Sequence, residues 1–258
     1  MHKTPLVRAL PLRRSLLSLL LLSPLVAQES AADAARMHVA LSLASGTFEH
    51  RTADSDLDDR TRAALFRLAG EYVGSAGFGG GLRLESMVSD DDLFEGKAGA
   101  NPVEASDGTV FVHGTYRFAS GPLDLPVRLG VTIGDYRLTD QVTDRETDYQ
   151  SAGVYFEAAP EWTVLANESL RWSVFAEAGV GIAATNIDPE GDARDYDATT
   201  ARYGFEVGTR VTFGRYEVAL SGIGRWQHMG ESDDNGGFAI AGYDSEFVGI
   251  SASFGVTF

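Results

Sequence analysis

The 258-residue sequence contains no cysteine. This excludes disulfide bonds and the lipid-modified cysteine by which lipoproteins are anchored, and it is compatible with a chain that crosses an oxidising compartment. After residue 26 the sequence also lacks an apolar run of the roughly 20 residues that a membrane-spanning helix needs. If the chain enters a membrane, it does so with another kind of element.

Basic residues are scarce. The chain has 21 Lys and Arg against 37 Asp and Glu, a formal net charge of −16. Four of the cations and no acid lie in residues 1–27, so the remaining chain carries close to −20. Such a charge repels nucleic acid and anionic surfaces unless cations bridge them, and we expect no nucleic-acid partner.

The N-terminus has the features of a secretory signal peptide. His2, Lys3, Arg8, Arg13 and Arg14 form a basic region, and the leucine-rich stretch 15–26 follows it. Small residues at 27 and 32 suit a signal-peptidase cleavage site, and the apolar stretch is too short to remain as an anchor. We expect residues 1–27 to be a cleaved signal peptide and 28–35 a short periplasmic segment.

Residues 36–258 show apolar side chains at every second position, the pattern of β-strands that lie between lipid and an interior. Only the segment 62–73 is ambiguous, because Ala, Leu, Arg and Glu also favour helices. The expected strands are 37–43, 62–73, 78–88, 109–118, 127–134, 150–164, 170–185, 203–213, 216–227 and 249–258. Pro160 weakens the end of its strand.

Short connections near 74–77, 119–124, 167–169 and 214–215 alternate with long ones near 51–61, 89–107, 139–148, 187–200 and 230–244. Short periplasmic turns and long external loops are typical of transmembrane β-barrels, whose strand counts in single-chain bacterial proteins are even. The sequence therefore predicts an all-β, antiparallel, up-and-down transmembrane barrel over 36–258. It has ten strands, or eight if 62–73 and a partner are not strands.

Charged residues within the strands fix which face is inside. Six Arg and six Glu share the inward parity, and the opposite register would set six Arg against lipid at about 2–4 kcal/mol each. Equal numbers of each sign predict a paired ionic network, because charges removed from water need partners. The expected members are Arg67, Glu71, Arg83, Glu85, Arg117, Arg128, Glu157, Glu177, Glu206, Arg210, Glu217 and Arg225.

This network allows two interpretations of the lumen. Barrels of eight to ten strands are about wide enough for side chains to fill, which predicts a closed interior. Small inward Gly and Ser positions also permit a water-filled pore that the charged residues line.

Aromatic residues near strand ends suggest girdles at the two membrane boundaries. The group next to the short turns is Tyr72, Phe78, Tyr116, Phe118, Phe213, Tyr216 and Phe258. The group nearer the long loops is Phe48, Tyr136, Tyr203 and Trp226.

The five long connections hold 23 of the 37 acidic residues but only five Lys or Arg. The run 54–59 opens like a calcium loop, yet Asp59 stands where Gly belongs and Leu65 where the bidentate Glu belongs. We therefore expect no dedicated metal site and no cofactor. Loose divalent-ion candidates are Asp54, Asp56, Asp58, Asp90 and Asp92.

The final strand ends with apolar residues at alternate positions and an aromatic last residue: Phe254, Val256 and Phe258. With the signal peptide, alternating strands and acidic loops, this pattern resembles the small bacterial outer-membrane β-barrel superfamily, which includes the membrane domain of outer-membrane protein A and the OmpX and OmpW groups. The resemblance implies that the barrel-assembly machinery reads this C-terminal segment. Ser253 stands where the family often has Gly.

The chain also resembles the omptin proteases in size. Their chemistry needs an Asp pair and an Asp-x-His pair at the outer rim. Asp90 and Asp92 mimic the first, but the sequence contains no Asp-x-His, and His50 and His228 lack a matching Ser for lipid A acyl-modifying chemistry. Catalysis needs a matched nucleophile, base and orienting group, so we expect no enzyme and no catalytic residue; a rim-sited hydrolase is the remote alternative.

From the sequence we expect a porin-like cell-envelope protein in the outer membrane of a Gram-negative-type bacterium. Its interior is filled and its role is in envelope structure or surface interactions, with a narrow channel for small solutes as the alternative. The expected partners are outer-membrane lipid and lipopolysaccharide, and, during biogenesis, periplasmic chaperones and the barrel-assembly machinery.

Overall fold

A computed structural model describes residues 35–53, 58–97, 99–192, 194, 196–233 and 235–258. The expected signal peptide (1–27) and all but the last residue of segment 28–35 lie outside this part of the chain. The described residues form strands and connections, and no helix among them is long and apolar enough to cross a membrane.

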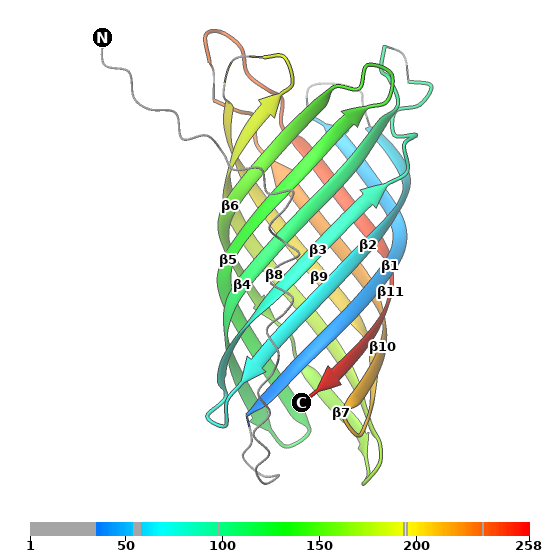
Figure 1. The fold of residues 1–258 in the computed structure, drawn as a ribbon, viewed down its shortest axis with the longest axis vertical. Helices are drawn as coiled ribbons and strands as arrows, with labels where there is room; N and C mark the ends of the chain where they lie inside the picture. Colours follow the sequence, from blue (N-terminus) through cyan, green and yellow to red (C-terminus); the bar gives the residue numbers. More distant parts are fainter. Residues whose placement is uncertain (1–34, 54–57, 98, 193, 195, 234) are drawn as a thin grey trace, which may run out of the picture. The chain divides into compact units, whose positions relative to one another are not determined.

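Eleven β-strands follow one another along the chain (Figure 1). They are β1 (Arg36–Thr52), β2 (Asp58–Val73), β3 (Phe78–Ser89), β4 (Val103–Ser120), β5 (Leu123–Asp140), β6 (Glu146–Ala158), β7 (Glu161–Ala166), β8 (Arg171–Pro189), β9 (Tyr196–Phe213), β10 (Tyr216–Met229) and β11 (Tyr243–Thr257).

β6 and β7 are two parts of one barrel strand. Both pair antiparallel with β8, β6 through Ala158 opposite Ala178 and β7 through Glu161 opposite Phe175. The interruption lies at Pro160, which lacks the N–H that a ladder needs. The barrel therefore has ten strands, the number that the sequence predicts.

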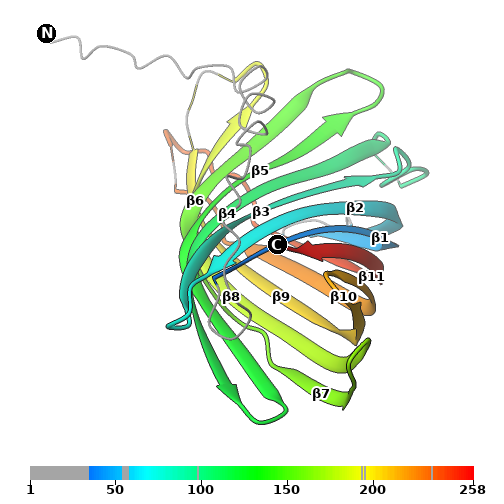
Figure 2. The same cartoon turned by 60° about the horizontal axis from the view of Figure 1, so that its bottom comes forward.

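The sheet closes because the first and last strands pair. β1 and β11 are in register from His38 opposite Thr257 to Thr52 opposite Tyr243, and the main chains of Met37 and Phe258 exchange hydrogen bonds. Every other neighbouring pair is also antiparallel, which gives the closed ring visible in Figure 2. Closure removes the free sheet edges that otherwise promote aggregation.

The ambiguous segment 62–73 is a strand. It forms most of β2, which pairs with β1 from Asp58 to Val73 and with β3 from Ala63 onward. Pairing on both sides satisfies every backbone group along the segment, and this outweighs a helix preference of a few tenths of a kcal/mol per residue.

The long connections are shorter than the sequence suggests. The expected loop 139–148 is only the turn 141–145, and the expected loop 187–200 is reduced to 190–195. The strands run on beyond their last outward apolar residue, so period-2 apolarity marks only part of each strand.

The two halves of the barrel differ in which face is apolar. Toward the short turns the exterior is apolar, with Leu43, Leu129 and Ile250 each at least 60% exposed. Toward the long loops the exterior becomes charged, as at Asp135 and Arg137 on β5, and the interior becomes apolar and aromatic. The long-loop half is thus built like a water-soluble barrel.

The assignment of Phe48 and Tyr136 to an outer girdle is wrong. Phe48 is 2% exposed and Tyr136 is 1% exposed, and both belong to the apolar cluster inside the long-loop half. Their positions have the inward parity of β1 and β5. Tyr203, at 48% exposed, does face outward.

We predict that Phe48→Ala lowers the free energy of unfolding by about 3–5 kcal/mol, because it leaves a cavity in a filled interior. Thr47→Ala, on the outward face one residue away, changes it by no more than about 0.5 kcal/mol. Urea titration of both variants in detergent micelles measures this difference; equal effects would contradict the inward placement of Phe48.

Candidate functional site

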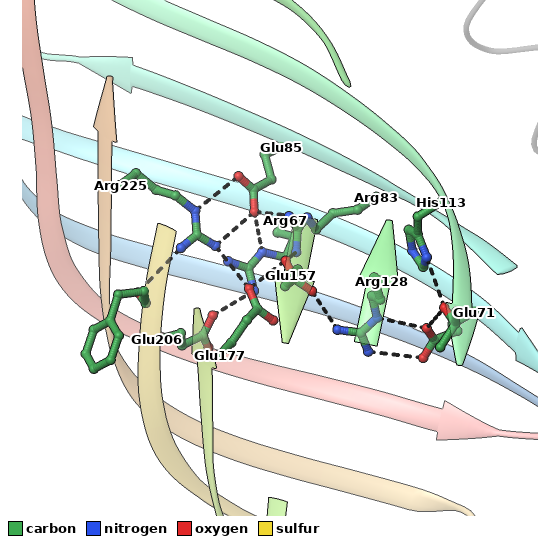
Figure 3. A network of polar contacts seen from close by, with 12 residues as sticks. Arg67, Glu71, Arg83, Glu85, His113, Arg128, Glu157, Glu177, Glu206 and Arg225 are labelled. Carbon is green, nitrogen blue, oxygen red and sulfur yellow. Dashed lines mark hydrogen bonds and ion pairs between the residues drawn. The ribbon is translucent and has the colours of Figure 1, made fainter. Parts of the chain in front are cut away.

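Nine charged side chains from seven strands meet inside the barrel (Figure 3). We call them the central cluster: Arg67, Glu71, Arg83, Glu85, Arg128, Glu157, Glu177, Glu206 and Arg225. Each occupies an inward position of its strand, because alternate residues of a closed sheet point to the lumen.

The ion pairs of the central cluster cross the lumen. Arg67 on β2 contacts Glu206 on β9 at 2.7 Å, and these strands lie four positions apart around the ring. Arg83 on β3 contacts Glu157 on β6 at 2.5 Å and Glu177 on β8 at 3.3 Å. These side chains therefore occupy the cross-section instead of lining an opening.

Contacts between nearer strands complete the central cluster. Glu85 is 2.7 Å from Arg67 and 3.1 Å from Arg225. Arg128 joins Glu71 at 2.8 Å to Glu157 at 2.6 Å. Four arginines face five glutamates, and each guanidinium touches at least two carboxylates.

Neutral groups satisfy further lone pairs and charges. Thr115 donates to Glu71 and Ser221 to Glu206. The Arg83 guanidinium lies 5.1 Å from the ring centre of Phe111, a cation–π distance. Glu157 is fully buried and bonded to two arginines, which is the condition under which a buried carboxylate is tolerated.

Three expected members of the network lie elsewhere. Arg210 and Glu217 contact each other near the short turns, at 3.5 Å, in a second group with Glu161, Arg171 and His38. Arg117 forms a separate pair with Asp124. No ion pair links these side chains to the central cluster among the described residues, so they form separate charged groups toward the short turns.

Several residues that form ion pairs in the lumen were not among the expected network. Glu161 and His38 have the inward parity that the sequence predicts but were left out of it, while Arg171 and Asp124 lie at strand ends. Asp107 lies inside the barrel in a segment that was expected to be a loop, and Arg202 lies inside just before the expected start of its strand. Extending the alternation by one residue before Tyr203 would have placed Arg202 inside.

Five aromatic rings close the lumen toward the long loops. We call them the aromatic cap: His50, Phe94, Tyr136, Tyr149 and Tyr243, which contact one another with ring centres 5.0–6.0 Å apart. The Tyr136 hydroxyl is hydrogen-bonded to His50 at 2.8 Å. The cap fills the interior directly beneath the external connections.

The connection between β3 and β4 folds into the mouth. Leu93 is fully buried and Phe94 is 5% exposed. The Phe94 main-chain N–H donates to Asp59 at 2.6 Å, and Thr61 bonds to Asp92. Phe94 has φ of 67°, an uncommon value for a bulky residue, and these tethers hold it there.

The acidic candidates do not converge on an ion site. Asp54 and Asp56 lie outside the described residues; Asp58 pairs with Arg51 at 3.2 Å, and Asp92 accepts the bond from Thr61. Asp90 is placed by a main-chain bond to Arg62. Among the residues that the structure describes, no group of three or more His, Asp or Glu side chains is arranged to hold a metal.

The carboxylate of Asp192, in the connection after β8, is paired with Arg194. Arg194 and Tyr196 donate to Asp192, and these hydrogen bonds hold the pKa of that carboxyl well below its ordinary value. The Arg194 guanidinium also lies 4.1 Å from the Phe238 ring centre and so links two external connections.

The two histidines considered for catalysis are far from a matched set. His50 is buried in the aromatic cap. His228 lies on the exterior of β10, 2.6 Å from Asp244, and both side chains are more than half exposed. Among the described residues, no Ser or Thr hydroxyl is hydrogen-bonded to either ring.

The chain matches no known protein family and no curated protein. Among solved structures it is similar to the outer membrane protease OmpT from Escherichia coli, at 12% identity and TM-score 0.48, covering 89% of this chain and 99% of that one. It is also similar to Neisserial surface protein A, at 10% identity and TM-score 0.36, covering 88% of this chain and 100% of that one. A third similar structure is Ail of Yersinia pestis, at 14% identity and TM-score 0.30, covering 84% of this chain and 98% of that one. At these values no activity carries over.

We predict that Arg83→Ala lowers the free energy of unfolding by about 3–5 kcal/mol, because Glu157 and Glu177 lose a buried partner. Arg210→Ala has a smaller effect, since the Arg210 side chain is itself more exposed than that of Arg83 (27% against 11%). The control is Arg60→Ala, which removes an exposed pair with Glu49 and costs at most about 1 kcal/mol.

Urea titration in detergent micelles measures all three variants. If Arg83→Ala is no more destabilising than Arg60→Ala, water reaches the central cluster and the lumen is not filled by side chains.

Proposed function

We propose that this protein is a non-catalytic outer-membrane β-barrel whose lumen is closed by side chains and whose acidic external loops serve envelope structure or surface interactions. The observation that carries the proposal is the set of Arg–Glu contacts joining opposite walls of the barrel. A pore would leave that cross-section to water, whereas here the central cluster and the aromatic cap occupy two successive levels.

Membrane placement is supported by the exterior of the short-turn half. Exposed apolar side chains encircle it, including Leu41, Val112, Val154, Phe205 and Phe254. Contiguous apolar surface of this extent is unfavourable in water. Because the sheet of the described residues is closed, it presents no free edge to lipid along the apolar band.

The same arrangement supports the outer membrane of a Gram-negative-type bacterium as the location, with lipid and lipopolysaccharide around the apolar band. The charged long-loop half then projects outward. Its acidic loops favour cationic partners or surfaces bridged by divalent ions.

The C-terminal strand supports a role in assembly. Phe254 and Phe258 are half-exposed on the exterior, with Val256 between them on the same face of β11. We propose that the barrel-assembly machinery and periplasmic chaperones recognise this face. Deleting Phe258 should lower the amount of folded protein in isolated outer membranes, while Val142→Ala, in an external turn, should not; equal yields would argue against this role.

The closed lumen predicts electrical silence. In planar bilayers the purified protein should give little or no steady conductance at neutral pH. Regular single-channel steps would reject the proposal in favour of a narrow solute channel.

The apolar band predicts a position-dependent cost for an outward arginine. Leu129→Arg, in the middle of the outward apolar run of β5, should lower folding stability in lipid vesicles by about 2–4 kcal/mol. Thr139→Arg, outward on the same strand but beyond the band, should cost less than about 1 kcal/mol. Equal costs in lipid would show that this band does not face the bilayer.

A further inference from the structure

A small chamber lies between the central cluster and the aromatic cap. Its volume is about 70 Å³, and a buried water needs only about 10–15 Å³ of such space. Its wall toward the cap includes Phe48, Tyr136 and Phe247, and Arg83, Glu85 and Arg225 border its other side. The side chains of the central cluster and of the aromatic cap do not fill this space.

Arg202 of β9 lines this chamber and is 8% exposed. Its two terminal nitrogens donate to neutral hydroxyls, Thr109 at 2.7 Å and Ser151 at 3.0 Å. Among the described residues, no acceptor lies within hydrogen-bond distance of its Nε. A buried donor left without an acceptor costs about 1–3 kcal/mol, so this position favours a bound acceptor.

The charge of Arg202 is also poorly compensated. Asp107 is its nearest carboxylate, and the closest oxygen is 3.9 Å from Nη2, too far for a hydrogen bond. Every arginine of the central cluster, in contrast, is bonded to at least one carboxylate. The other two guanidiniums on the chamber wall, those of Arg83 and Arg225, belong to the central cluster and each pair with its carboxylates.

The backbone makes room for this guanidinium. A Cβ atom added to Gly134 on β5 would lie 2.3 Å from Nη2 of Arg202 and 2.6 Å from Nη1. In this conformation the guanidinium occupies the space that a side chain at position 134 would take. The group is therefore held in a fitted position by Gly134, Thr109 and Ser151, with Nε as the remaining donor.

We propose that this chamber is a binding site for a small monovalent anion, of the size of a halide, nitrate or short carboxylate, held by Arg202. The site binds through the Nε–H donor and the charge of the Arg202 guanidinium, to which no carboxylate is hydrogen-bonded. Its aromatic wall excludes large, strongly hydrated anions. The site is independent of conductance, since a barrel that is electrically silent can still hold an ion.

The test uses the full-length folded protein in detergent. Thermal unfolding is followed in sodium bromide, nitrate or acetate against sodium gluconate at equal ionic strength, and crystals soaked in bromide are examined by anomalous scattering. We expect the small anions to raise the melting temperature with saturation, and a bromide peak within contact distance of Arg202 Nε. An unsaturated effect equal in all salts, or no peak there, would overturn the proposal.

Two variants act in opposite directions. Arg202→Gln should abolish the saturable effect, and Asp107→Asn, which removes the negative charge nearest Arg202, should strengthen bromide binding about tenfold. Arg60→Gln on the exterior is the matched control and should leave binding unchanged. If Arg202→Gln does not fold, Asp107→Asn decides: unchanged or weaker binding in that variant contradicts an anion site.

Discussion

The arginine–glutamate contacts across the lumen are the interaction on which the rest of the structure depends. A ten-stranded sheet that closes on itself encloses a column too narrow for a second element and too wide to leave empty. Apolar side chains are already committed to the exterior of the short-turn half, so its interior is filled by polar ones. Long Arg and Glu side chains span the lumen, and they are tolerated there because each charge meets its opposite.

The same strands have the opposite distribution of apolar residues in the long-loop half. Beyond the apolar exterior band the pattern inverts: β5 carries Ile133 outward within the band, and then Asp135 outward with Tyr136 inward. In the membrane placement that we propose, one continuous strand thus serves both as a membrane strand and as part of a barrel in water. The aromatic cap and the inserted Leu93 and Phe94 are the core of that second part.

Much of this was predictable from the sequence, because the two-residue period fixes the face of a side chain once one charged position is assigned. Strand number, closure order and the inward position of Arg83 or Glu206 follow from that. The period does not show where the exterior changes from apolar to charged, so Phe48 and Tyr136 were misplaced and Arg202 and Asp107 were left outside the expected strands. The period also does not show which charged side chains form ion pairs across the lumen, because those pairs depend on the stagger of the strands. For this reason Arg210 and Glu217, which have the inward parity, belong to another group.

The most direct measurement is a double-mutant cycle on Arg67 and Glu206, which lie on nearly opposite walls and contact each other at 2.7 Å. Arg67→Met, Glu206→Gln and the double variant are unfolded by urea under identical conditions. A filled, ion-paired lumen predicts a coupling free energy of at least about 1 kcal/mol, within the range seen for residues in direct contact. Additive effects, with no coupling, would contradict the closure of the lumen by these pairs.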